Sequence, residues 1–302
     1  MKLAFVIVNF HSDQDTLSII KDLEDNDLVK DVEVTIYAVD NSRSDNFKNA
    51  LEDKKQVVYI NSPMGNVGFA KGNNLGIKKA MEDGSDFICL INNDTQAPHD
   101  LVKNIINSPI SDPAVGAVGG LIYFAKGFEF KDKYSPGERG RVVWFAGGYF
   151  DWDNVMGSND HVDEVDDGQF TQNIDTDFVT GALFITRSEV LKKTGLLDEK
   201  YFMYLEDMDL CHRIKLLGLR LVVDPKIKIW HKVAQSSGIG SGLNDYFITR
   251  NRLLFGFKYA KVRTKLALLR EAVKFIFFGR PTQKLAVMDF FTLNFKKGSF
   301  IK

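Results

Sequence analysis

Cysteine is scarce in this sequence of 302 residues, which contains only Cys89 and Cys211. Both lie in segments that we predict to be buried, and their spacing does not fit a metal site. Stable disulfides are rare in reducing compartments, so the low cysteine content favours a protein that functions in a reducing compartment.

Long apolar runs are also missing. No run reaches the ~18 apolar residues of a membrane-spanning helix. The first residues, MKLAFVIVNFH, become polar too early for a signal peptide and predict a first strand instead. We therefore expect a chain that is soluble or attached to a membrane surface.

Two phosphate-binding signatures are absent as well. No G-x-G-x-x-G follows the first predicted strand, which disfavours a Rossmann oxidoreductase, and no G-x-x-x-x-G-K-[ST] occurs, which disfavours a P-loop enzyme. Hydrophobic residues make up 44% of the chain and charged residues 26%, which are ordinary proportions for a globular protein.

The first 125 residues alternate between strand and helix patterns. Predicted strands cover Lys2–Asn9, Val34–Val39, Val57–Ile60, Phe87–Ile91 and Val115–Tyr123, and predicted helices cover Asp15–Asp25, Phe47–Asp53, Ala70–Met81 and Leu101–Ile106. This alternation predicts an α/β fold in which helices flank a mostly parallel central sheet.

Three of these strands end in polar residues, namely Asn9-Phe10-His11, Asp40-Asn41-Ser42 and Asn92-Asn93-Asp94. Asparagine and aspartate also cap their own backbone in simple turns. Three such sets at one edge of a sheet, where ligands bind in open α/β folds, nevertheless indicate a pocket. Asn92 and Asp94 lie two positions apart, so in an extended chain their oxygen atoms could share one hard cation.

The segment Tyr204–Gly218 predicts a helix with three carboxylates, Glu206, Asp207 and Asp209, in its first turn. Carboxylates favour helix N-termini, and Asp209 can pair with Arg213 four positions later, which accounts for Asp209. These two preferences do not explain why the aromatic run YFMY, at residues 201–204, precedes Glu206 and Asp207 as the wall of a pocket would.

The rest of the chain up to residue 257 is less regular. Predicted strands cover Val142–Ala146, Tyr149–Asp151, Phe178–Arg187, Leu221–Asp224 and Lys228–His231, and predicted helices cover Ser188–Lys193, with Ser188 as N-cap, and Asn244–Phe257. Ser236–Gly242 predicts a flexible loop that could act as a lid.

A lone histidine such as His231 is more often structural than a metal ligand. Arg250 and Arg252 could meet a phosphate or form surface ion pairs.

Charge is distributed unevenly along the chain. Residues 256–302 carry eleven Lys or Arg residues against Glu271 and Asp289, whereas the other 255 residues have a net charge of −10. Apolar residues at helical spacing stand among these basic residues, as in a helix lying on an anionic bilayer. A helix pair packed on the domain or on a partner in a homodimer fits the same pattern. The basic residues are interleaved with aliphatic and aromatic stretches and no RNA- or DNA-binding motif occurs, which disfavours a nucleic acid partner.

Taken in order, the motifs resemble those of inverting glycosyltransferases of family 2, which have the GT-A fold. They are VNFH at 8–11, VDNS at 39–42, NVGFAKGNN at 66–74, LINNDT at 90–95, TGALFITR at 180–187, FMYLEDMDLCHRIKLLG at 202–218 and WH at 230–231. Within the family, the resemblance points to bacterial rhamnosyltransferases of cell-wall or capsular polysaccharide synthesis. It implies one GT-A domain over residues 1–255, with a nucleotide-binding half to about 125 and an acceptor half from about 126. Residues 256–302 then form a basic amphipathic helical extension.

The resemblance also implies a role for each matched residue. Residues that would surround the nucleotide sugar are Val8, Asn9, Asp40, Gly68, Lys71, Gly72, Asn73, Asn93 and Asp94. The Asp40 carboxylate would accept from the imide N–H of a pyrimidine. Asp94 and His231 would bind Mg²⁺ or Mn²⁺, whereas Asn92 stands where the family has a carboxylate and is a weaker ligand. Asp207 would be the base that deprotonates the acceptor hydroxyl, with Glu206 as its alternative.

The implied reaction is a single displacement with inversion at the anomeric carbon. The expected donor is dTDP-rhamnose, with UDP-galactofuranose or another UDP-hexose as alternatives, and the expected acceptor is a glycan or a lipid-linked glycan. A lipid-linked acceptor implies a cytoplasmic protein at the inner face of the cell membrane. An alternative of another class is a catalytically silent scaffold that binds nucleotide sugars, which only Asn92 favours.

Overall fold

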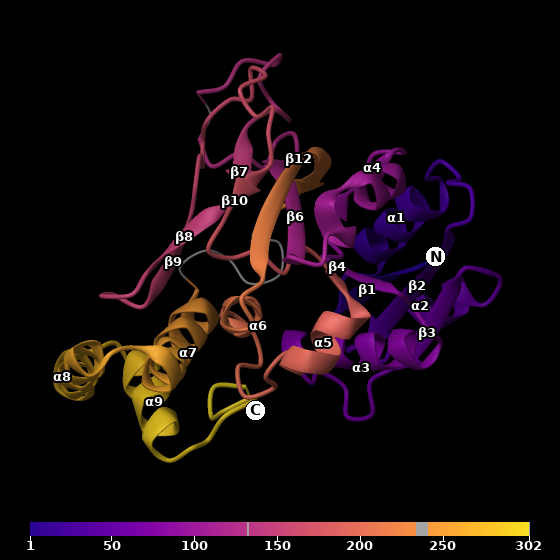
Figure 1. Ribbon diagram of the computed structural model, residues 1–302. Coiled ribbons are helices and arrows are strands. Elements are labelled where there is room, and N and C mark those ends of the chain that lie inside the picture. Colours follow the sequence, from indigo (N-terminus) through magenta and orange to yellow (C-terminus); the bar gives the residue numbers. More distant parts are fainter. Residues whose placement is uncertain (132, 234–240, 302) are drawn as a thin grey trace.

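The computed structural model describes residues 1–131, 133–233 and 241–301. Its main sheet has the strand order β10-β12-β6-β11-β4-β1-β2-β3, and two short strands, β5 and β7, pair with β12 and β6 (Figure 1). The strands are β1 (Lys2–Asn9), β2 (Glu33–Asp40), β3 (Val57–Asn61), β4 (Phe87–Ile91), β5 (Thr95–Gln96), β6 (Val115–Phe124), β7 (Val143–Phe145), β10 (Ile174–Asp175), β11 (Leu183–Arg187) and β12 (Arg220–His231). A separate hairpin pairs β8 (Gly148–Asp151) with β9 (Met156–Asn159).

Most of the longer strands in the main sheet run parallel to the strands beside them. β1 pairs in parallel with β2 and β4, β2 with β3, and β6 with β12, whereas β11 is antiparallel to both β4 and β6. Every residue of β4 and β6 is buried, as expected for apolar strands in the middle of an α/β sheet. The predicted fold class is therefore confirmed.

Helices cover both faces of the sheet. They are α1 (Asp13–Glu24), α2 (Asp45–Leu51), α3 (Phe69–Glu82), α4 (Leu101–Asn107), α5 (Ser188–Thr194), α6 (Glu206–Leu216), α7 (Gly242–Tyr259), α8 (Val262–Phe278) and α9 (Pro281–Phe291), with a short 3₁₀ turn, η1, at Pro109–Ser111. Helices α1 and α4 lie together on one side of β1 and β2, and α3 lies on the other side (Figure 1). α3 approaches β1 so closely that a Cβ atom on Gly76 would lie 2.4 Å from the Val6 side chain. Glycine therefore sets the distance between this helix and the sheet.

The strand predicted to start at Phe178 is shorter than expected, because β11 begins only at Leu183. Before it, the Gly181 N–H donates to the Asp207 carboxylate at 2.9 Å and not to a neighbouring strand. The two strands predicted over residues 221–224 and 228–231 form one strand, β12, with an irregular register between Asp224 and Lys228.

The predicted N-cap of α5 is also wrong. Ser188 is the first helical residue, and its hydroxyl donates to the carbonyl of Ser85 in the turn before β4. In the predicted lid, residues 236–240 lie outside the described part of the chain. Ser241 follows them and caps α7 by accepting from the Asn244 N–H.

Helices α7, α8 and α9 form a group at the lower left of Figure 1, away from β1–β3. α7 continues through residue 255 without a break, so one helix joins the sheet domain to the chain that follows. A Cβ atom on Gly256 would lie 2.2 Å from the Leu268 side chain, so glycine lets α8 pack closely on α7. Among the described residues, no helix has the length and apolar character needed to cross a membrane.

Candidate active site

The polar ends of β1, β2 and β4 lie at the same edge of the sheet. Asn9 is in register with Asp40 on β2, and β4 pairs with the other side of β1. A cavity of about 710 Å³ opens at this edge, and it is lined by His11, Ser12, Asp13, Gln14, Asp15, Ser42 and Ser44. Two of the three predicted polar sets therefore line an open cavity, through His11 and Ser42, whereas the set that follows β4 does not line it.

Asp40 is fully buried and orders the loop that follows β2. Its carboxylate accepts from the backbone N–H groups of Ser42, Arg43 and Ser44 at 2.9, 3.1 and 2.7 Å. The Tyr59 hydroxyl donates to the same carboxylate at 3.1 Å. Burial, together with this carboxylate, raises the pKa of Tyr59 to about 12, so the tyrosine stays a donor.

A chain of hydrogen bonds joins β1, α1 and the end of β4. Asn9 is buried and donates to Asp13 at 2.7 Å. The Thr16 hydroxyl donates to Asn9 at 3.0 Å, and the Asn93 amide donates to Thr16 at 3.0 Å. Asn9 and Asn93, both predicted nucleotide residues, are thus held in one polar network.

Three predicted metal ligands come together at the end of β12. The Nε2 atom of His231 lies 3.0 Å from Oδ1 of Asp94, and the Asn92 amide nitrogen lies 3.4 Å from the same Nε2. Both Asp94 and His231 are buried, and the Trp144 ring meets the imidazole edge-on at 4.7 Å between centroids.

The residues of this cluster fit a divalent cation. The Asn92 Oδ1 atom is buried and has no hydrogen-bond partner among the described residues. With the Asp94 carboxylate and the His231 Nε2 atom that faces it, this amide oxygen completes a set of oxygen and imidazole ligands that suits divalent metals. No group of three His, Cys, Asp or Glu side chains that could hold a metal occurs in the described ranges, which reflects the amide at Asn92.

Side chains from other elements pack closely against two glycines at the N-terminal end of α3. Gly68 has a φ of +88°, and a Cβ atom there would lie 2.5 Å from the Phe202 ring. A Cβ atom on Gly72 would lie 3.0 Å from the Val8 side chain. The Asn73 amide donates to the Phe69 carbonyl, and Lys71 on the same turn is half-buried. Gly72 therefore places the first turns of α3 against Val8 at the end of β1.

Glu206 and Asp207 begin α6, beside β11. The Asp207 carboxylate accepts from the N–H groups of Gly181 at 2.9 Å and Met208 at 2.8 Å. Glu206 is buried, and its Oε2 atom has no hydrogen-bond partner within the described part of the chain. Burial, and then the charge of Asp207, raises the pKa of Glu206 well above its usual range. Burial also raises the pKa of Asp207, but the two N–H groups oppose this shift. Asp207 is therefore the carboxyl that ionises first.

The loop before α6 is held in an unusual conformation. Phe202, Tyr204 and Leu205 all have positive φ angles, between 65° and 68°, although none is glycine. The Asn251 amide from α7 donates to the carbonyls of Tyr201, Met203 and Tyr204 at 2.8–2.9 Å. These hydrogen bonds offset the backbone strain and fix where α6 begins. No sequence signal identified Asn251 as the residue that does this.

The two arginines of α7 do not lie at a phosphate site. Arg250 is fully buried and donates to the carbonyls of Lys200, Tyr201 and Lys296. Arg252 donates to the Asn154 carbonyl and pairs with Glu271 at 2.6 Å. Both guanidiniums are thus used in packing the C-terminal helices, which corrects the predicted phosphate contact.

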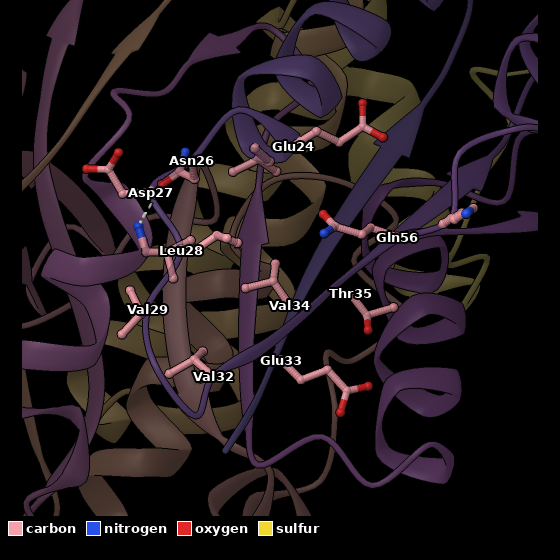
Figure 2. Close-up of a pocket in the computed structure, with 13 residues that line it drawn as sticks. Glu24, Asn26, Asp27, Leu28, Val29, Val32, Glu33, Val34, Thr35 and Gln56 are labelled. Atoms are coloured by element: carbon pink, nitrogen blue, oxygen red, sulfur yellow. Dashed lines mark hydrogen bonds between the residues drawn. The ribbon is translucent and has the colours of Figure 1, made fainter.

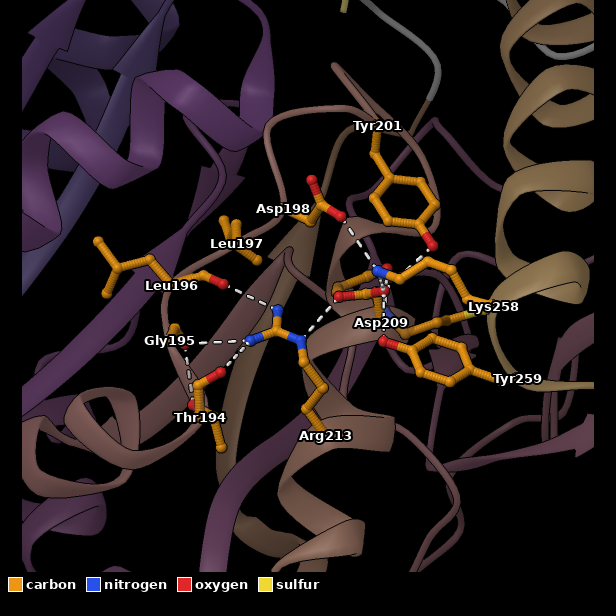
Figure 3. A network of polar contacts seen from close by, with 12 residues as sticks. Thr194, Gly195, Leu196, Leu197, Asp198, Tyr201, Asp209, Arg213, Lys258 and Tyr259 are labelled. Carbon is orange, nitrogen blue, oxygen red and sulfur yellow. Dashed lines mark hydrogen bonds and ion pairs between the residues drawn. The ribbon is translucent and has the colours of Figure 1, made fainter. Parts of the chain in front are cut away.

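Asp209 is the centre of a buried network that ties α6 to α7 (Figure 3). It pairs with Arg213 at 2.8 Å, as predicted, and Arg213 also donates to the carbonyls of Thr194, Gly195 and Leu196. The hydroxyls of Tyr201 and Tyr259 donate to Asp209 at 3.1 and 2.9 Å, and Lys258 forms an ion pair with it. Lys258 and Tyr259 were missed because they lie 49 and 50 positions away in the chain.

A second cavity, of about 300 Å³, lies at the opposite edge of the sheet (Figure 2). It is lined by the end of α1, the loop that follows, the start of β2, and residues from other elements, including Gln56 and Val102. Neither cavity is lined by a predicted catalytic, nucleotide or metal residue, but Asp13 and Ser42 of the first cavity are hydrogen-bonded to Asn9 and Asp40. The candidate active site is therefore the edge with the polar strand ends.

The family model described as "Glycosyltransferase like family 2" matches residues 2–256. The chain belongs to glycosyltransferase family 2. It is 24% identical to the dTDP-rhamnosyl transferase RfbF of Shigella flexneri over 243 residues, which make up 80% of this chain and 73% of that protein. Over 61 residues, 20% of each chain, it is 34% identical to N-acetylglucosaminyl-diphospho-decaprenol L-rhamnosyltransferase of Mycobacterium tuberculosis.

The structure of this family 2 glycosyltransferase is similar to that of a solved mannosyltransferase, PcManGT from Pyrobaculum calidifontis, in complex with GDP-Man and Mn²⁺. The TM-score is 0.56 at 12% identity, and the match covers 96% of this chain and 74% of that one. This likeness confirms the predicted GT-A fold, and the family confirms the predicted glycosyltransferase activity.

Proposed function

We propose that this glycosyltransferase transfers L-rhamnose from dTDP-rhamnose to a glycan or lipid-linked glycan, with inversion at the anomeric carbon. The observation that carries the donor is the similarity to the dTDP-rhamnosyl transferase RfbF, which extends over most of both chains. A lipid-linked acceptor is supported by the shorter similarity to the Mycobacterium tuberculosis enzyme, whose name describes a decaprenol acceptor. With such an acceptor, the reaction takes place at the inner face of the cell membrane.

In this proposal, the edge with the polar strand ends binds the nucleotide sugar. Asp94 and His231, with Asn92, would hold Mg²⁺ or Mn²⁺, which would neutralise charge that builds on the diphosphate as the sugar leaves. The Asp207 carboxylate accepts the proton of the acceptor hydroxyl as that oxygen attacks the anomeric carbon. The Gly181 N–H fixes the orientation of this carboxylate, and Glu206 orients the acceptor.

The first test is calorimetric binding of dTDP, UDP, GDP and ADP, each with Mn²⁺ and with EDTA. We expect dTDP to bind most tightly of the four nucleotides, and we expect its binding to be weaker in EDTA than in Mn²⁺. A preference for UDP would move the donor to UDP-galactofuranose or another UDP-hexose. Binding of dTDP without any transfer of rhamnose from dTDP-rhamnose to acceptor lipid would favour the silent scaffold.

A further inference from the structure

Helix α8 carries a row of large apolar side chains that the protein leaves exposed. Only Thr264, Leu268 and Ala272 of this helix are buried, and they lie four positions apart along one line. Seven large apolar side chains of α8 are exposed, and Phe278, the last residue of the helix, lies apart from the others with an exposed fraction of 83%. The other six are Val262, Leu266, Leu269, Val273, Ile276 and Phe277, with exposed fractions between 38% and 73%. At about 100° per residue, these six fall on a single stripe that faces away from the buried line.

Basic residues border this stripe on both sides. Arg263, Arg270 and Lys274 fall along one border of the stripe, and Lys265 falls along the other. None of these four side chains has a hydrogen-bond or ion-pair partner in the described part of the chain. They are therefore free to meet an external negative charge.

The two carboxylates of the C-terminal segment are turned inward. Glu271 points to the opposite side of α8 and pairs with Arg252 of α7 at 2.6 Å. Asp289 is buried, where it accepts from Asn294 and Ser299 and from the Tyr246 hydroxyl. The outward charge of α8 is thus entirely positive, which suits a negatively charged partner.

We propose that the exposed stripe of α8 binds the surface of an anionic lipid bilayer, with the helix lying in the plane of the membrane. The apolar stripe would enter the acyl region, and the four basic side chains would reach the phosphate groups at the level of the headgroups. A second copy of the chain is a poor occupant, because two stripes brought face to face would also bring their basic borders together. The proposal does not depend on which sugar is transferred.

The test is co-sedimentation of the full chain with vesicles. We expect binding to phosphatidylcholine vesicles that contain about one-third phosphatidylglycerol, weaker binding to phosphatidylcholine alone, and loss of binding at high salt. The double variants Leu266→Ser/Phe277→Ser and Arg270→Glu/Lys274→Glu should each lower the partition coefficient about tenfold or more.

Matched controls separate this surface from general effects. Leu28→Ser removes an apolar side chain that is 96% exposed in the loop after α1, and Lys48→Glu/Lys78→Glu reverses two exposed charges on α2 and α3. Neither should change vesicle binding, and no variant should change nucleotide binding measured by calorimetry. Equal binding to neutral and anionic vesicles would overturn the proposal. The proposal would also be overturned if the wild-type chain did not bind vesicles but formed a dimer, measured by light scattering, that the α8 substitutions dissociated.

Discussion

The Nε2 atom of His231 lies 3.0 Å from Oδ1 of Asp94, although the two residues are 137 positions apart. Strand pairing brings them together, because β5, which follows Asp94 directly, is antiparallel to the end of β12 with His231 opposite Thr95. The Lys232 N–H also donates to the Asp94 carbonyl at 2.9 Å. The backbone therefore holds both side chains in place before any cation arrives.

This arrangement predicts how metal dependence responds to substitution. His231→Ala removes one ligand, so the Mn²⁺ concentration for half-maximal activity should rise about tenfold to a hundredfold. Asn92→Asp adds a second carboxylate beside Asp94 and should lower that concentration about tenfold. Metal titrations of activity, and of metal binding by calorimetry, measure both effects. If Asn92→Asp left the Mn²⁺ requirement unchanged, Asn92 would lie outside the metal site.

Asp207→Asn tests the proposed base. The asparagine oxygen can still accept from Gly181, so the local structure and nucleotide binding should persist. The side chain can no longer take a proton, so turnover should fall about 10²–10⁴-fold. Glu206→Gln is the matched control, and it should retain more activity than Asp207→Asn. Near-normal turnover in Asp207→Asn would assign the base role to Glu206.

The raised pKa of Glu206 predicts a cost in stability at neutral pH. A carboxyl whose pKa is higher in the folded protein holds its proton more tightly there than in the unfolded chain, so the free energy of unfolding falls as the pH rises from its unfolded pKa towards its folded pKa. Glu206→Gln removes this titration. The variant should therefore melt about 2–4 °C higher than the wild type at pH 7, and this advantage should shrink below about pH 4. Thermal melts across this pH range provide the test, and an advantage that grew towards acid pH would contradict it.

The sequence predicted the elements of the first 125 residues well because its information there is local. The strands predicted there are short apolar runs, three of which end in polar residues, and β1 and β4 match the predicted ranges residue for residue. The helix bearing Asp207 was also predicted, because apolar residues recur at helical spacing within it. For the same reason, the pairing of Asp209 with Arg213, four positions apart, could be predicted.

Contacts between segments that are distant in the chain could not be predicted from the sequence. The guanidinium of Arg250 has the same chemistry whether it meets a phosphate or three backbone carbonyls, and only the fold decides between them. The positive φ angles before α6 fall on ordinary residues, so no glycine marks them. The antiparallel direction of β11 depends on the long irregular chain before it, which has little periodicity to interpret.

Asn251 offers a test of whether the loop before α6 sets the position of the base. Its amide donates to three carbonyls of that loop, and its oxygen accepts from Arg250, so Asn251→Ala leaves several buried polar groups without partners. We expect a loss of about 2–3 kcal/mol in the free energy of unfolding, measured by urea denaturation. Asn244→Ala, on the same helix but with no side-chain hydrogen bond in the described structure, is the control and should be neutral. Phe202 of this loop lies against Gly68 in the proposed nucleotide site, so dTDP affinity should weaken somewhat. Turnover should fall further, because Asp207 follows the loop directly. Equal losses in dTDP affinity and turnover would instead show that Asn251 supports the whole fold and not the placement of Asp207.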